Sequence, residues 1–272
     1  MSRQGVLEMI QTVNDHLTKV AVRVDERSEE VRSDRRCVVL LSGGLDSTVL
    51  MYSLVNDFEV WPITVSYGQR HNKEIMAARS VCEARDHNLL LRWRYVDLSV
   101  LRTLLPSALT GVGEIPHGHY ESESMKATIV PNRNMILLAL AAGYANGIGA
   151  KHLAYAPHKG DHPLYPDCRE VFIQAVRQAI KLGTGWNEDG VELHTPFSRM
   201  TKADIVKLGE KLNVPFKVTW SCYEGGEKHC GVCGTCIERI EAFELVGVKD
   251  PTMYEDYSHQ FECNLPFEAH QC

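Results

Sequence analysis

Residues 38–48 read VVLLSGGLDST and carry the strongest structural signal in the chain. The apolar run from Cys37 to Leu41 predicts a buried strand, and residues 47–56 predict a helix. Between them, two glycines allow the backbone to approach a ligand, and hydroxyl groups can donate hydrogen bonds. The first amides of the helix point at an anion with the helix dipole behind them. A plain strand-to-helix turn is the alternative, but the strand and helix context favours a phosphate-binding loop.

This loop differs from the Walker A sequence because no Gly-Lys-Ser/Thr ending follows its glycines. Ser-Gly-Gly-x-Asp-Ser after the first strand instead resembles the PP-loop of ATP-pyrophosphatases, which release pyrophosphate as the substrate becomes an adenylate. The resemblance implies ATP as cofactor and a role for Asp46 in managing Mg²⁺ and phosphate charge. The implied ATP-binding residues are Leu40, Leu41, Ser42, Gly43, Gly44, Leu45, Asp46, Ser47, Thr48 and Lys202.

Strand and helix patterns alternate along the rest of the chain. This order predicts a doubly wound, mainly parallel α/β sheet. The resemblance to PP-loop proteins implies a sheet of the adenine nucleotide alpha hydrolase-like type. Expected strands are 37–41, 60–65, 91–96 and 152–156, and expected helices are 47–56, from 72, 134–146, 167–182 and 201–212, the last capped by Thr201. We expect an extension with an amphipathic helix (1–36), a PP-loop domain (37–215), a zinc-binding segment with a helix (216–250) and a tail (251–272).

Composition restricts the class of protein. The chain has 272 residues and a formal net charge of −6, which argues against broad binding to nucleic-acid backbone. No apolar run approaches the roughly 20 residues that a membrane span needs, and the N-terminus lacks the order of a signal peptide. A cytoplasmic protein with no membrane or direct nucleic-acid partner is expected.

Four cysteines near the C-terminus have metal-ligand spacing: Cys222, Cys230, Cys233 and Cys236. Glycines between them permit tight turns, and four thiolates suit tetrahedral Zn²⁺ in a structural site. A redox motif or an iron-sulfur site is the alternative. The fourth cysteine and proline of a bacterial ferredoxin run are missing, so zinc is the expected metal.

Three further segments narrow the family: Tyr67-Gly68-Gln69-Arg70-His71, Pro131-Asn132-Arg133-Asn134 and Tyr165-Pro166-Asp167-Cys168-Arg169. With the PP-loop and the four cysteines they make the chain similar to the QueC family of 7-cyano-7-deazaguanine synthases over residues 37–240. The resemblance implies that ATP activates 7-carboxy-7-deazaguanine, that ammonia attacks, and that a second activation yields the nitrile with release of AMP and pyrophosphate. A homodimer is expected.

The resemblance also implies roles for individual residues. The expected catalytic residues are Asp46, Arg70, Arg133 and Lys202. The expected substrate-binding residues are Tyr67, Gln69, Arg133, Asp161, Tyr165, Asp167 and Arg169. Four of these residues have a structural alternative: a surface salt bridge for Arg70 or Arg133, an exposed helix position for Lys202, and a helix N-cap for Asp167.

One stretch departs from the family pattern. His162-Pro163-Leu164 stands where the family has Tyr-Ser-Gly. We expect this stretch to lie beside the substrate, so it raises an alternative in which an amine of a partner protein replaces ammonia, as in QueC-like relatives from antiviral defence operons. Two further alternatives are tRNA thiolation, which the acidic chain disfavours, and a zinc-ribbon binding module with an inert α/β domain.

Overall fold

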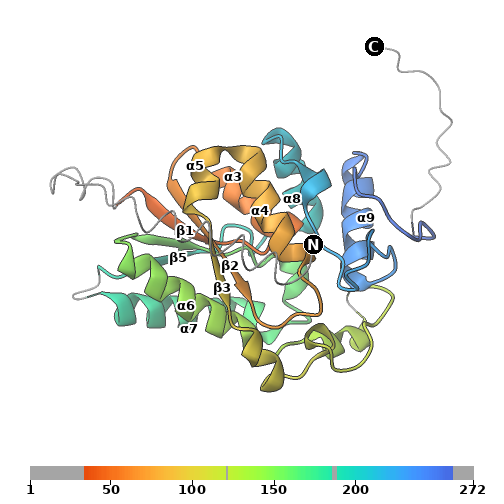
Figure 1. The fold of residues 1–272 in the computed structure, drawn as a ribbon, viewed down its shortest axis with the longest axis horizontal. Coiled ribbons are helices and arrows are strands. Elements are labelled where there is room, and N and C mark those ends of the chain that lie inside the picture. The colour runs from red at the N-terminus through yellow and green to blue at the C-terminus, as the bar shows by residue number, and fades with distance from the viewer. Residues whose placement is uncertain (1–33, 121, 186–188, 260–272) are drawn as a thin grey trace, which may run out of the picture.

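Five parallel strands form one sheet at the centre of the molecule, in the order β3-β2-β1-β4-β5 (Figure 1). The structure is a computed structural model and describes residues 34–120, 122–185 and 189–259. The strands are β1 (Arg36–Leu40), β2 (Glu59–Ser66), β3 (Arg94–Asp97), β4 (His152–Ala154) and β5 (Glu192–His194). The strand order reverses between β1 and β4, as in a doubly wound sheet, so the predicted fold class is confirmed.

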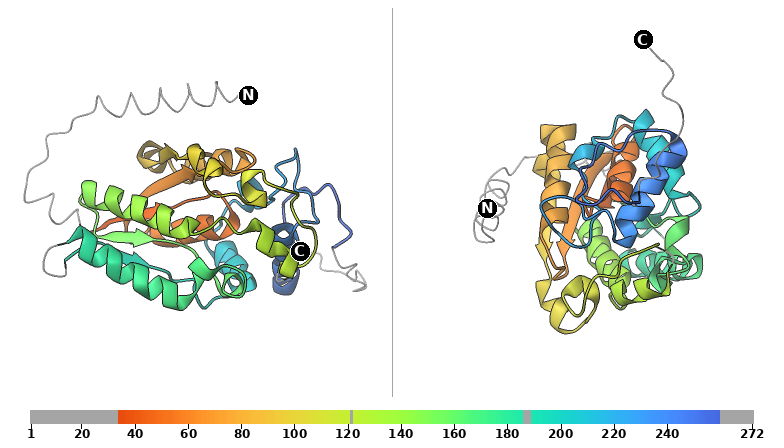
Figure 2. Two further views of the ribbon diagram at one scale, coloured as in Figure 1. Left: turned by 90° about the horizontal axis from the view of Figure 1, so that it is seen from below. Right: turned by 90° about the vertical axis from the view of Figure 1, so that its right-hand side faces the viewer.

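Helices cover both faces of this sheet (Figures 1 and 2). One face carries α3 (Leu45–Leu54), α4 (Lys73–Arg85), α5 (His87–Arg92) and α8 (Lys202–Lys211). The other face carries α6 (Arg133–Gly147) and α7 (Glu170–Thr184). Helix α9 (Gly234–Val246) packs beside α8, and short 3₁₀ helices span Ser99–Thr103, Ala108–Thr110, Glu123–Thr128, Lys159–Asp161, Pro166–Cys168 and Phe216–Val218.

Strand β1 is buried on both sides because its side chains alternate between two cores. Val39 belongs to the core under α3, α4 and α8, whereas Val38 belongs to the core under α6 and α7. A strand that is covered twice in this way is typically apolar throughout, which is why residues 37–41 form an unbroken apolar run.

Most predicted elements are present, with shifted ends. Thr201 caps α8 as expected, because its hydroxyl accepts from the Asp204 amide and the Asp204 carboxylate accepts from the Thr201 amide. The strand predicted at 91–96 was wrong at its start: Leu91 belongs to α5, which the Asp86 side chain caps by accepting from the Leu89 amide. The three-residue strand β5 and the 3₁₀ helices were not predicted.

The predicted amphipathic helix at residues 5–20 lies outside the described residues, as does the chain beyond residue 259.

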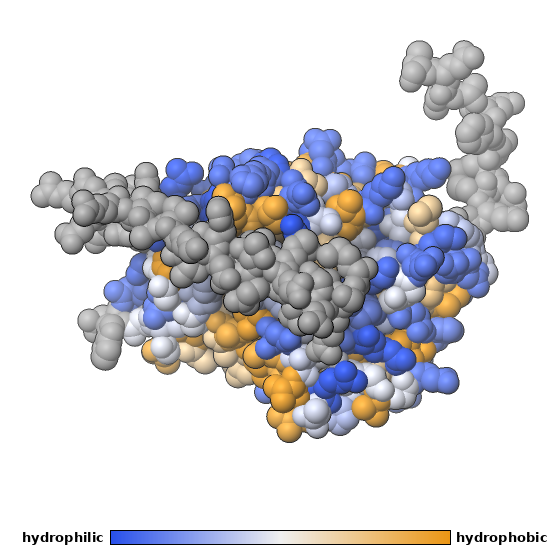
Figure 3. Space-filling view, in the orientation of Figure 1, coloured by the Kyte–Doolittle hydropathy of each residue, from blue (hydrophilic) through white to orange (hydrophobic). Residues whose placement is uncertain are grey.

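The surface in Figure 3 is mainly hydrophilic in its upper half, with apolar residues gathered lower down. The exposed large apolar side chains include Val100, Leu104 and Val112. Within the described ranges, every helix is too short or too polar to cross a membrane.

Candidate active site

A pocket opens at the carboxyl ends of β1, β2 and β4, where ligands bind in doubly wound sheets. The PP-loop forms one wall, the residues after β2 and β4 form others, and the chain around Cys222 to Glu238 closes a further side. The sequence-predicted residues that line it are Leu40, Leu41, Ser42, Gly44, Leu45, Asp46, Ser47, Tyr67, Gln69, Arg133, Asp161, Tyr165 and Lys202.

Gly43 lets helix α4 pack directly on the PP-loop. Its φ is +88°, and a Cβ at this position would lie 2.2 Å from the Glu74 carbonyl oxygen and 2.5 Å from the Ala78 nitrogen. An L-residue would therefore be strained and would push the helix away. Gly43 itself does not line the pocket, so its role in the fold is this close approach.

The hydroxyl groups of the PP-loop form hydrogen bonds within the turn that leads into α3. Ser42 Oγ lies 2.9 Å from Ser47 Oγ and accepts from the Gly44 amide at 3.1 Å. The Thr48 hydroxyl donates to the Gly44 carbonyl oxygen at 2.7 Å and points away from the pocket. The first amides of α3 have no partner within the helix, so the loop offers them to an anion.

Lys202 joins two carboxylates on the floor of the pocket. Its ammonium lies 2.7 Å from Asp46 Oδ2 and 3.1 Å from Glu238 Oε2. Burial is the largest single influence and raises the pKa of Asp46, but the Lys202 charge, His158 and hydrogen bonds together lower it overall. Asp46 is therefore ionised at neutral pH, while its Oδ1 atom is buried without a hydrogen-bond partner.

His158 and Asp161 extend this polar cluster. The Asp161 carboxylate accepts from the Tyr120 hydroxyl at 2.9 Å and from the His158 amide at 2.9 Å. His158 Nδ1 accepts from the Gly160 amide, so the proton of the neutral ring sits on Nε2, 3.6 Å from Glu238 Oε1. This cluster thus has three carboxylates, those of Asp46, Asp161 and Glu238, around one lysine.

Arg133 and Tyr67 form the opposite wall. The guanidinium lies 5.1 Å from the centre of the Tyr67 ring and donates to its hydroxyl at 3.1 Å. Burial raises the pKa of Tyr67 to about 12, so it stays neutral. Next to them, Tyr165 contacts the hydroxyls of Thr128 and Tyr223 at 2.9 and 3.2 Å. This aromatic wall suits a flat ring system.

Besides Gly43 and Thr48, three predicted site residues lie outside the pocket lining. The exposed Arg70 donates to the carbonyl oxygens of Ala108 and Gly113 and so holds that loop. Asp167 accepts from the Asn134 amide at 2.9 Å, which caps α6 rather than the helix that follows Asp167 in sequence. Arg169 donates to the His162 carbonyl oxygen at 3.0 Å. Ligand contacts for these three residues stay predictions.

The divergent residues 162–164 also lie outside the pocket lining, although the flanking Asp161 and Tyr165 line it. Leu164 is buried in a small core with Tyr120 and Tyr165. These three residues therefore do not line the pocket as expected, and Leu164 instead packs behind Tyr120 and Tyr165.

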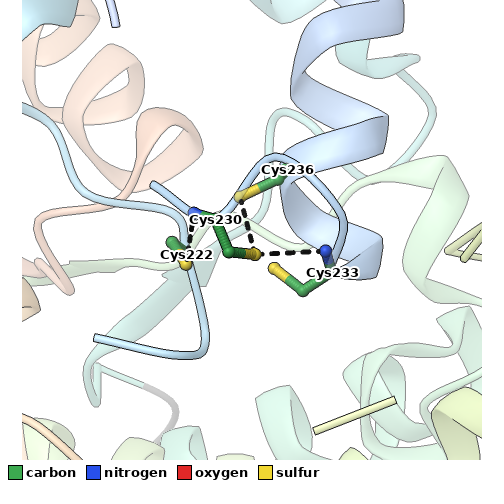
Figure 4. Close-up of side chains that lie close together, drawn as sticks. All are labelled: Cys222, Cys230, Cys233 and Cys236. Carbon is green, nitrogen blue, oxygen red and sulfur yellow. Dashed lines mark hydrogen bonds between the residues drawn. The ribbon is translucent and has the colours of Figure 1, made fainter. Parts of the chain in front are cut away.

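The four cysteines converge in space (Figure 4). Their sulfur atoms all lie within 4.8 Å of one another, and Cys230 Sγ is 3.9 Å from Cys236 Sγ. A tetrahedral ion with Zn–S bonds of 2.3 Å places its sulfur atoms about 3.8 Å apart. The four side chains therefore fit a single metal ion.

This cysteine segment is tied to the PP-loop. The Trp220 amide donates to the Gly43 carbonyl oxygen at 2.9 Å, and the Trp220 indole donates to the Cys222 carbonyl oxygen at 2.8 Å. Cys233 caps α9, whose residue Glu238 reaches the pocket. A metal ion in this segment would hold one wall of the pocket in place.

Sequence reasoning missed several pocket residues: Glu74, Tyr120, Tyr155, Trp220, Tyr223 and Glu238. Only Glu238 carried a usable signal, because a carboxylate one turn into a helix of largely apolar composition needs a partner. The other five come from segments whose approach to the pocket depends on long-range packing.

A parallel sheet with a Ser-Gly-Gly-x-Asp-Ser loop at its carboxyl edge, and an aspartate and a lysine paired beside that loop, defines a PP-loop protein. The family of the queuosine biosynthesis protein QueC matches residues 36–247, and the chain belongs to this family.

Individual relatives agree with this membership. The chain is 49% identical over 222 residues to a 7-cyano-7-deazaguanine synthase of Caldicellulosiruptor bescii, covering 81% of this chain and 97% of the relative. It is 50% identical over 223 residues to one of Archaeoglobus fulgidus, covering 81% and 91%. Among solved structures, an NH3-dependent NAD synthetase from Campylobacter jejuni matches with a TM-score of 0.42 and 14% identity over 91% of this chain and 85% of that one. At this identity and TM-score, the likeness does not indicate a shared function.

Proposed function

We propose that this chain is a 7-cyano-7-deazaguanine synthase. It activates 7-carboxy-7-deazaguanine with ATP, lets ammonia attack the adenylate, and activates the resulting amide again to give the nitrile, AMP and pyrophosphate. The observation that carries this proposal is that one pocket contains both the PP-loop anion site and an aromatic wall suited to a flat ring.

Adenylation answers a chemical difficulty. A carboxylate is a poor electrophile because its leaving group would be oxide, whereas an acyl adenylate loses AMP readily. The amide oxygen is equally hard to expel, so the same activation serves the second step. A pocket that binds both reactants side by side supplies the proximity that such a reaction needs.

The PP-loop and Lys202 would bind the phosphates. Ser42, Ser47 and the first amides of α3 offer hydrogen-bond donors, and the Lys202 ammonium supplies positive charge beside them. Both of its carboxylate partners raise the pKa of Lys202 against the effect of burial, so it stays charged.

Mg²⁺ is the metal that fits beside Asp46. The Oδ1 atom of Asp46 is buried and has no hydrogen-bond partner among the described residues, and Asp46 lies with two further carboxylates around Lys202. Mg²⁺ prefers such oxygen ligands and neutralises phosphate charge. For the four-cysteine site we propose Zn²⁺ in a structural role, since four protein ligands leave no open position for water.

The substrate would contact Tyr67, Gln69, Arg133, Asp161 and Tyr165, which share the pocket with the PP-loop. Arg133 can neutralise the carboxylate of the acid before activation, because a guanidinium matches a carboxylate in geometry and charge. A homodimer and a cytoplasmic location stay predictions from the sequence.

The test is a turnover assay on purified, zinc-loaded protein with ATP, Mg²⁺, ammonia and the deazaguanine acid. AMP, pyrophosphate and the nitrile are expected, and Asp46→Asn is expected to abolish all three. Absence of AMP and pyrophosphate from the wild type would rule the proposal out. Transfer to a protein amine, the alternative raised by residues 162–164, has no support in the names of the relatives.

A further inference from the structure

Glu74 has its carboxylate in the pocket but no partner there. It lies in the first turn of α4 and lines the same pocket as the PP-loop. Among residues 34–120, 122–185 and 189–259, none makes a hydrogen bond or ion pair with this carboxylate. Its oxygens are also not among the buried unpartnered atoms, so they face the open space of the pocket.

The other carboxylates that line the pocket are already engaged. Lys202 holds Asp46 and Glu238, and the Tyr120 hydroxyl donates to Asp161. Of the acidic side chains among the described lining residues, Glu74 alone has neither carboxylate oxygen in contact with a protein donor.

The position of Glu74 is fixed relative to the phosphate site. Its carbonyl oxygen packs on Gly43 so closely that a Cβ there would lie 2.2 Å away. On its other side, the Arg133 charge favours its ionised form, and Arg133 is itself held by the Tyr67 hydroxyl at 3.1 Å. Glu74 therefore stands between the PP-loop and the aromatic wall.

Burial disfavours the ionised form of Glu74 in the pocket. It raises the pKa of the carboxyl to about 7, although Arg133 opposes the shift. A partly buried carboxylate that has no protein donor is well suited to receive donors from a ligand.

We propose that Glu74 recognises the guanine-like edge of the substrate by accepting hydrogen bonds from the ring N1–H and the 2-amino group. This inference rests on the proposed function and names the specificity residue of the same pocket. Two adjacent donors match the two oxygens of one carboxylate. Adenine presents a ring acceptor beside its amino group instead, so this carboxylate also selects against the base of ATP. Asp167, which was predicted from the sequence to bind the substrate, accepts from the Asn134 amide with one of its carboxylate oxygens.

The test is equilibrium binding by calorimetry in the presence of Mg²⁺ and a non-hydrolysable ATP analogue. Two ligands are compared: the deazaguanine acid and the same acid without its 2-amino group. The wild type is expected to prefer the first by about 10- to 100-fold, the range of a good bidentate contact to a base. Glu74→Gln keeps one acceptor oxygen, which the N1–H of either acid can occupy, and its NH2 group then faces the 2-amino group, so its preference is expected to fall to within about threefold of unity. Glu74→Asp is expected to keep part of the preference.

Glu83→Gln is the matched control, because Glu83 is an exposed glutamate of the same helix. It is expected to bind both acids as the wild type does, and the ATP analogue should bind Glu74→Gln with unchanged affinity. Three outcomes would each overturn the inference. The preference for the 2-amino acid could persist in Glu74→Gln, the wild type could show no preference, or Glu74→Gln could lose affinity only for the ATP analogue. A wild type that binds and discriminates but releases no pyrophosphate overturns the proposed function and leaves the role of Glu74 standing.

Discussion

The ammonium of Lys202 lies 2.7 Å from the carboxylate of Asp46, across 156 positions of sequence. This contact joins the start of α8 to the PP-loop, where phosphate charge would develop. Lys202→Met removes the cation and leaves Asp46, Glu238 and Asp161 facing one another. We expect pyrophosphate release to fall by about 100- to 1,000-fold, the usual effect of losing one electrostatic contact to a transition state.

Lys207→Met is the control for this change. Lys207 is an exposed lysine of the same helix, so its loss is expected to leave the rate within about twofold. Melting temperatures of both variants show whether a loss of rate comes from catalysis or from unfolding. If Lys202→Met folds like the wild type and keeps more than about a tenth of the rate, the lysine has no catalytic part.

The PP-loop and the four-cysteine cluster could be predicted from sequence because each is a short motif whose geometry is local. The glycines and hydroxyls of residues 42–48 act within a single turn, and three of the four cysteines lie within seven residues. The core of the sheet could be predicted for the same reason, because a buried parallel strand is apolar along its whole length.

The remaining site residues depend on contacts between distant segments. Asp167 follows a proline and precedes a helix, so its sequence context suggests a cap for that helix, yet its carboxylate accepts from the Asn134 amide instead. Tyr223 reaches the pocket only because the cysteine segment folds back over the PP-loop through Trp220. No local pattern encodes such an approach, since it is set by how α6, α7 and α9 pack.

The cysteine cluster predicts that metal and activity are lost together. Cys233→Ser is expected to lower zinc from about one ion per chain to below about 0.2, and to lower the melting temperature by about 5–10 °C, because structural zinc contributes folding energy directly. Activity should fall as well, since Trp220 links this segment to Gly43. Metal content is measured by mass spectrometry and melting by calorimetry.

Cys82→Ala serves as the comparison, because Cys82 is a buried cysteine far along the sequence from the cluster. It should keep its full zinc content. Full zinc in Cys233→Ser, or a metal-free protein that melts like the wild type, would contradict a structural zinc site.

Arg239 and Asp250 form a buried ion pair that fastens α9 to the chain after it. Arg239 Nε lies 2.8 Å from Asp250 Oδ2, and the two side chains are only 1% and 6% exposed. Arg239 also donates to the Thr219 hydroxyl at 2.7 Å. Arg239→Met leaves a buried carboxylate without its cation, so we expect a loss of about 3–5 kcal/mol in the free energy of unfolding.

Chemical denaturation measures this loss. Lys249→Met, at an exposed position beside the pair, should change stability by less than about 0.5 kcal/mol. In the double variant Arg239→Met/Asp250→Asn the loss should be smaller than the sum of the single losses, because the unpaired charge is gone. Additive losses would mean that the two residues are not coupled.

The raised pKa of Glu74 predicts a dependence of stability on pH. Burial raises this pKa from 4.5 in an exposed chain to about 7 in the native state. Between these values the native state binds more protons than the unfolded state, so the stability of the wild type falls as pH rises. Glu74→Gln is neutral at every pH and escapes this cost. The two proteins should be similarly stable at about pH 5, and the variant should gain about 2 kcal/mol over the wild type by about pH 8.

Urea denaturation at the two pH values, with Glu83→Gln as a control that shows no such gain, measures the difference. If the gap between Glu74→Gln and the wild type stays constant with pH, Glu74 is ionised in the native pocket throughout this range, because only a proton bound near neutrality produces the slope.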